Sequence, residues 1–120
     1  MNILSPRIHR FLDVATVLLF ALAPTLFSLA GTAAVLSYGL AVVHLGVTVA
    51  TEFPGGPARP LPLRTHGVLE VVVGVGLVAL PWVLGWTGDA RAFYVAVGAI
   101  IMLVWALSRY RTAPSAGATA

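Results

Sequence analysis

The segment that decides the fold is Arg64-Thr-His-Gly-Val-Leu-Glu70, followed by an uncharged run that ends in Leu80-Pro-Trp-Val-Leu-Gly-Trp86. An earlier segment matches it at a constant shift of 57 residues. The matched pairs are Arg7 and Arg64, His9 and His66, Leu12 and Leu69, Asp13 and Glu70, Pro24 and Pro81, and Gly31 and Gly88. Both halves therefore begin with Arg-x-His-x-x-Leu-acid, and an internal repeat of this kind indicates a fold built from two similar units.

The composition is that of a membrane protein. Of the 120 residues, 59% are apolar and 9% are charged, against about 25% charged in an ordinary soluble domain. A single soluble domain of this length cannot bury so much apolar surface, so we expect lipid to surround it. The chain has no cysteine, which excludes disulfides, thiol catalysis and cysteine-ligated metals.

Four apolar runs are each about as long as a bilayer core requires, which is roughly 20 residues for a helix. They are residues 11–29, 33–51, 68–86 and 92–108. Backbone groups in lipid must be hydrogen-bonded within the segment, so the runs should be helices. The predicted fold is all-α: a four-helix transmembrane bundle of two tandem, parallel-repeat helical hairpins.

The predicted organisation has five parts. They are a cytoplasmic N-terminal leader (1–10), a first transmembrane hairpin (11–51), a Pro/Gly-rich cytoplasmic connector (52–65), a second hairpin (66–108) and a disordered C-terminal tail (109–120). A cleaved signal peptide is the competing interpretation of the first thirty residues. Asp13 interrupts its apolar core and Pro24 has a repeat partner in Pro81, so we favour a retained helix.

Arginine positions predict the orientation. On the predicted topology only Arg91 lies on one side, and the other side carries Arg7, Arg10, Arg59, Arg64, Arg109 and Arg111. Because positive residues remain in the cytoplasm, we expect both termini and the connector to be cytoplasmic, in a protein of the bacterial inner membrane.

The segment from Leu80 to Trp86, with the short turn and apolar span that follow it, resembles the SPW repeat family. These are small membrane proteins whose repeat is two transmembrane helices with Ser-Pro-Trp late in the first helix. Leu80 stands at the serine position here, and the first copy, Leu22-Ala-Pro-Thr-Leu26, has Thr25 at the tryptophan position. The resemblance covers about residues 7–110; it implies the two-hairpin architecture and no assigned chemistry.

Pro24 and Pro81 are placed about two turns from the outer ends of their spans. A proline there kinks the helix and frees one carbonyl. The kink either shapes a cavity or hinge, or it allows Trp82 to wedge between helices, with Gly85 and Trp86 completing the motif. We favour packing, because a bundle can satisfy the freed carbonyl.

Two histidine–acid pairs are the first candidate site. His9 and Asp13, like His66 and Glu70, are four residues apart and share a helix face. If a pseudo-two-fold axis relates the hairpins, the pairs can form a divalent-metal set or a proton relay. Alternatively, the acids serve only the positive ends of the helix dipoles and pair with nearby arginines.

His44 is the second candidate, near the middle of its span with no other ionisable group predicted at that depth. Such a group is a functional hypothesis by default. It can be an axial haem ligand, or a neutral imidazole hydrogen-bonded to Tyr38, Ser37 or Thr48 that holds helices together. We favour the second role.

Small residues can bring helices into close contact. They occur as Gly46-x-x-x-Ala50 and Ala92-x-x-x-Ala96, and as Gly74 and Gly76 in the third span. Whether they act within the bundle or between subunits stays open.

The sequence contains no motif that predicts an enzyme, a cofactor or a bound nucleic acid. We expect a structural or accessory protein of the lipid bilayer that binds itself, as a homo-oligomer, or a larger membrane partner. The alternative is ion or small-solute transport or proton handling by the embedded histidines and carboxylates.

Overall fold

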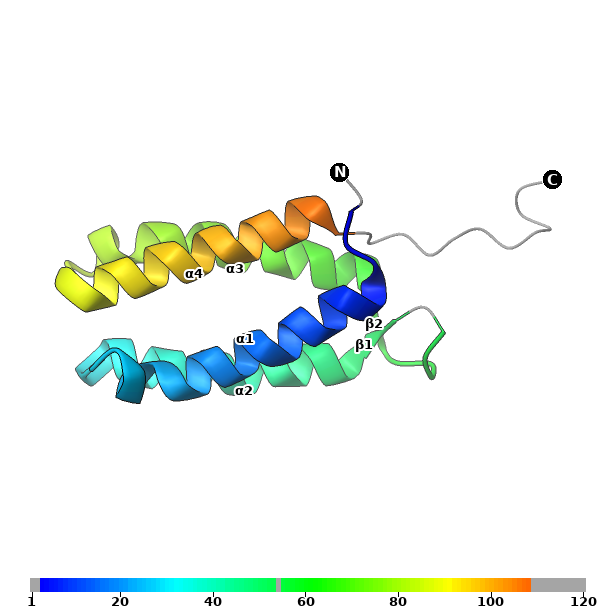
Figure 1. Cartoon of the computed structure of the whole chain (residues 1–120), viewed down its shortest axis with the longest axis horizontal. Helices are drawn as coiled ribbons and strands as arrows, with labels where there is room; N and C mark the ends of the chain where they lie inside the picture. The colour runs from blue at the N-terminus through cyan, green and yellow to red at the C-terminus, as the bar shows by residue number, and fades with distance from the viewer. Residues whose placement is uncertain (1–2, 54, 109–120) are drawn as a thin grey trace.

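A computed structural model describes residues 3–53 and 55–108 of the chain. It contains α1 (Pro6–Leu26), α2 (Gly31–Ala50), α3 (Leu63–Val83) and α4 (Gly88–Leu107). The protein is an all-α four-helix bundle, as predicted (Figure 1). Each helix has 20 or 21 residues and is apolar enough to cross a membrane, and its length of about 30 Å matches a bilayer core.

The four helices form two antiparallel hairpins, α1–α2 and α3–α4, that lie side by side (Figure 1). Both tight turns, residues 27–30 and 84–87, lie at one end, here called the turn end. The other, the connector end, holds β1 (Thr51–Glu52) and β2 (Leu61–Pro62), which pair in parallel. Because both hairpins start at the connector end, α1 and α3 run in the same direction.

The helix bounds follow the spacing of the sequence repeat. Adding 57 to the bounds of α1 gives those of α3, and adding 57 to the bounds of α2 gives those of α4. The connector end follows the same spacing, since an isolated parallel bridge between Leu4 and Ser108 corresponds to the pairing of Leu61 with Thr51.

Both first helices of the hairpins end in the same way. The Leu29 N–H donates to the Pro24 carbonyl at 3.0 Å, and the Trp86 N–H donates to the Pro81 carbonyl at 2.7 Å. The residue before each donor has a positive φ, 53° at Ser28, which makes each end a Schellman motif. The prediction of prolines about two turns from the end is wrong, because each helix stops two residues after its proline.

Two predicted boundaries shift because helices α1 and α3 continue beyond their apolar runs. Helix α1 begins inside the predicted leader (1–10), where Ser5 caps the Ile8 N–H and Pro6 takes the first helical position. That pair is a strong start signal. Helix α3 begins at Leu63, inside the predicted connector (52–65), directly after Pro62. The prediction of a disordered tail falls on residues outside the described part.

The close approach of α3 and α4 depends on two glycines. A Cβ on Gly98 would lie 2.8 Å from the Gly74 carbonyl oxygen. By contrast, a Cβ on Gly76 or on Gly46 would meet nothing within 4 Å. The small-residue faces that contain Gly46 or Ala92 are exposed on the outside of the bundle.

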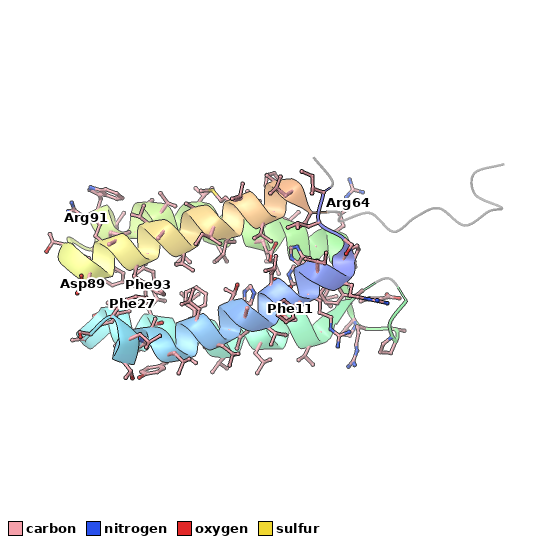
Figure 2. The ribbon with its side chains drawn as sticks, in the orientation of Figure 1. Phe11, Phe27, Arg64, Asp89, Arg91 and Phe93 are labelled. Atoms are coloured by element: carbon pink, nitrogen blue, oxygen red, sulfur yellow. The ribbon has the colours of Figure 1, made fainter. Side chains whose placement is uncertain are left out.

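Aromatic side chains join the hairpins at the turn end. Phe93 of α4 lies 5.5 Å from the Phe27 ring and 6.0 Å from the Phe20 ring, and Figure 2 shows Phe27 and Phe93 pointing toward each other. The Tyr94 hydroxyl crosses between the hairpins and donates to the Ala33 carbonyl at 2.6 Å. These contacts fix the turn end.

Trp82 takes no part in this packing, contrary to the prediction that it wedges between helices. Its side chain is 59% exposed, and the Arg91 guanidinium lies 5.1 Å from its ring. The buried stripe of α3 passes through Leu77 and Pro81. The next residue is rotated by about 100° from that stripe, so Trp82 faces outward. Trp86 lies against Tyr94 instead, at 4.9 Å.

Candidate functional site: a buried histidine–carboxylate cluster

The connector end encloses four ionisable side chains that face one another between α1 and α3. His9 Nε2 lies 3.2 Å from Asp13 Oδ1 and 3.0 Å from Glu70 Oε1. His66 Nε2 lies 3.1 Å from Asp13 Oδ2 and 3.3 Å from Glu70 Oε1. Each imidazole therefore touches both carboxylates, and every side chain is at most 5% exposed. We call these four residues the His–carboxylate cluster.

Helix geometry explains why the two pairs meet. Each pair is four residues apart and so occupies one helix face. That face is buried in both helices. Since α1 and α3 run in the same direction from the connector end, positions that differ by 57 lie at the same depth. The sequence prediction that the pairs could face each other thus describes the arrangement in the structure.

Two hydroxyl groups orient the imidazoles, and the sequence analysis missed both. His9 Nδ1 lies 2.6 Å from Ser108 Oγ, and His66 Nδ1 lies 2.7 Å from Thr51 Oγ1. Each hydroxyl donates its own proton to a helix carbonyl, that of Val104 or Val47. A hydroxyl has one proton to donate, so each oxygen must accept from the imidazole. Both Nδ1 atoms therefore carry hydrogen.

This hydrogen-bonding pattern directs both Nε2 atoms at carboxylates. With hydrogen on Nδ1, a neutral imidazole presents a lone pair at Nε2. Ionised carboxylates offer only lone pairs as well. Oδ2 of Asp13 is buried and makes no hydrogen bond, although an imidazole nitrogen lies 3.1 Å from it. Lone pairs that converge in this way require cations between or on them: either added protons or a metal ion.

A signal for the two hydroxyls was present in the sequence. Thr51 and Ser108 are 57 residues apart, and each directly follows the last residue of the second helix of its hairpin. Each one reaches the histidine of the other hairpin. The repeat comparison could therefore have paired them, but their contacts depend on how the hairpins pack together.

His44 joins the edge of the cluster, contrary to the prediction that it has no ionisable neighbour at its depth. Its Nε2 lies 3.5 Å from Asp13 Oδ1. Asp13 precedes the end of α1 by 13 residues (26 − 13), and His44 follows the start of α2 by 13 residues (44 − 31). Antiparallel helices joined by a short turn place such positions side by side, so this contact could have been predicted.

The hydrogen-bond partners predicted for His44 are not used. Ser37 donates to the Phe20 carbonyl at 2.6 Å, Tyr38 is exposed, and the Thr48 hydroxyl makes no hydrogen bond. The cavity beside His44 has a volume of about 40 Å³. That is close to one water molecule and too small for the predicted alternative, a haem group.

The chain matches no protein family, no curated protein and no solved structure in the comparisons made.

Proposed function

We propose that this chain is a small integral membrane protein whose His–carboxylate cluster binds one divalent transition-metal ion between its two hairpins. The observation that carries the proposal is the orientation of the two imidazoles. Both Nδ1–H groups are held by hydroxyls, so both Nε2 lone pairs point at the carboxylates. Metal-binding histidines are held in this way, with the second ring nitrogen donating to a fixed partner.

The spacing of the ligand atoms supports the proposal. Four ligand atoms at about 2.0–2.1 Å from a central ion are about 3.3–3.4 Å apart in a tetrahedron. One nitrogen or oxygen from each of the four residues lies within 4.8 Å of the others, and the nearest nitrogen–oxygen pairs are 3.0–3.3 Å apart. A small contraction of the longer separations would complete the tetrahedron.

The ligand chemistry limits the metal. Two imidazole nitrogens and two carboxylate oxygens suit Zn²⁺, Fe²⁺ or Mn²⁺ better than the soft Cu⁺, which prefers sulfur. Two carboxylates also balance the two charges of the ion, with neutral imidazoles completing the set. The site is enclosed by four residues that are at most 5% exposed, which favours a retained ion over one in transit.

The passive alternative is a network of protonated histidines and carboxylates that only holds the hairpins together. A metal titration separates the two. We expect the protein, purified in detergent and stripped with a chelator, to bind one Zn²⁺ per chain. The double variant Asp13→Asn with Glu70→Gln should lose binding, and Ser37→Ala, which removes a buried hydrogen bond elsewhere, should keep it.

The result that overturns the proposal is equally clear. If the double variant and the natural protein bind Zn²⁺ with the same affinity and stoichiometry, the cluster is not the site. If neither binds Zn²⁺, Fe²⁺ or Mn²⁺, the cluster is a proton-bearing network, and the structural or accessory role becomes the better hypothesis.

The orientation in the membrane is part of the proposal. Figure 2 places Arg64 and Arg91 at opposite ends of the bundle. Arg7 and Arg10 in the first turns of α1, and Arg59 in the connector, join Arg64 at the connector end, which supports a cytoplasmic connector end. A reporter fused after Ala120 should then be active only in the cytoplasm of a bacterial host.

The repeat and the assembly are proposals as well. The shared helix bounds and Schellman motifs support two tandem copies of one hairpin, which is the architecture that the resemblance to the SPW repeat family implies. The exposed small-residue faces at Gly46 and Ala92 would suit a second copy or a larger membrane partner.

A further inference from the structure

The cavity beside His44 is bordered by the proposed metal site on one side and by apolar side chains on the other. Its polar lining comes from His44, His66 and Glu70. The rest of the lining is apolar: Phe20, Leu40, Val43, Val47, Leu69, Val73 and Ile101. At about 40 Å³ it has room for one water molecule or a ligand of similar size.

The two hairpins differ at this cavity. Position 44 in α2 corresponds to position 101 in α4 at the shift of 57, and both residues line the cavity. His44 therefore stands where the second hairpin carries Ile101. The four residues of the cluster follow the repeat, whereas His44 adds a polar group on one side only.

His44 is placed to bind something other than the protein. Its Nε2 is buried and makes no hydrogen bond in the described part of the chain. The 3.5 Å to Asp13 Oδ1 is too long for an effective hydrogen bond. His44 also lies outside the group of four whose ligand atoms converge. A buried nitrogen left unpaired is costly, unless a ligand occupies the space beside it.

We propose that this cavity is an exogenous-ligand site on the metal centre, where one small neutral molecule coordinates the ion and hydrogen-bonds to His44 Nε2. The inference rests on the proposed metal site. Metal centres that react keep one coordination position open in addition to their protein ligands. Water would hold that position at rest, and a neutral diatomic molecule would displace it, because the apolar lining disfavours a charged ligand.

Nitric oxide is a suitable probe, because it binds ferrous ions as a neutral diatomic and gives a characteristic half-integer-spin EPR signal. The full chain in detergent is loaded anaerobically with Fe²⁺, and its iron content is measured in the same samples that receive nitric oxide. The Fe–NO bond forms as the bound water leaves, and no other reactant is needed. We expect one nitrosyl adduct per bound iron.

Two variants test the geometry. Ile101→Phe fills the cavity and should abolish the nitrosyl signal while iron content stays unchanged. His44→Leu keeps the volume and removes the hydrogen bond, so it should speed nitric oxide release by about threefold to tenfold. Leu103→Phe adds the same bulk on the exposed side of α4 and should have no effect.

The outcomes separate this inference from the metal proposal. If the natural protein holds no iron, the metal site itself is wrong, and the ligand site fails with it. If iron is bound but forms no nitrosyl adduct, only the ligand site is overturned. If His44→Leu lowers iron affinity and increases nitric oxide binding, His44 is itself a metal ligand, and the inference is also wrong. Should Ile101→Phe fail to fold, the release rate of His44→Leu still decides.

Discussion

Replacing Thr51 by Val is the most direct test of how the cluster is oriented. Valine has nearly the shape of threonine and lacks only the hydroxyl. The substitution removes the acceptor of the His66 Nδ1–H at 2.7 Å and leaves that N–H buried. The imidazole would then be free to rotate or to change tautomer, and its Nε2 lone pair would no longer be fixed toward the carboxylates.

The expected size of the effect follows from this single contact. Removing the partner of a metal-binding histidine weakens metal affinity by about 10-fold to 100-fold, which corresponds to about 1.4–2.7 kcal/mol. Ser108→Ala removes the equivalent contact to His9 and should cause a loss of similar size. A near-equal loss from two positions 57 residues apart would arise only if both hydroxyls serve one ion.

Competition with a chelating dye of known Zn²⁺ affinity measures the effect. Thr16→Val is the matched control, because the Thr16 hydroxyl donates to the carbonyl four residues earlier, as Thr51 does, and contacts no imidazole. The control should keep the natural Zn²⁺ affinity. If Thr51→Val and Thr16→Val lower thermal stability alike and leave Zn²⁺ affinity unchanged, the hydroxyl does not orient a metal ligand and the reasoning fails.

Three further predictions concern the bundle itself, each checked by thermal unfolding in detergent. Ser28→Gly should stabilise the protein by about 1 kcal/mol and Gly85→Ser should destabilise it by a similar amount, because both positions have positive φ, which favours glycine; equal changes in the two variants would contradict this. Gly98→Ala should destabilise by about 1–3 kcal/mol, since its Cβ would lie 2.8 Å from a carbonyl oxygen of α3, whereas Gly76→Ala meets open space and should be neutral or stabilising. Tyr94→Phe should destabilise by about 1–3 kcal/mol, because it removes the hydroxyl that donates to a carbonyl of the other hairpin; an unchanged melting temperature would mean that this contact does not hold the turn end together.

The sequence by itself determined the class of fold. Long uncharged runs need helices in lipid, and short turns make neighbouring helices antiparallel, so the four-helix arrangement follows from local pattern. The shift of 57 also placed the two histidine–acid pairs at equal depth. Helix ends were less predictable, since α1 starts at a cap and a proline outside the apolar run. The orientation of Trp82 was wrong because the prediction followed the Pro-Trp motif and not the face that α3 buries.

Only the tertiary structure decided what the polar residues face. Equal depth does not say whether two helix faces point toward each other, and the answer depends on the rotation of each hairpin about its axis. That rotation brings His9 within 3.0 Å of Glu70, and it brings each hydroxyl to the histidine of the other hairpin. A hydrogen bond across 99 residues, such as that between His9 and Ser108, leaves no local pattern in the sequence. It exists because packing carries both groups to the same end of the bundle.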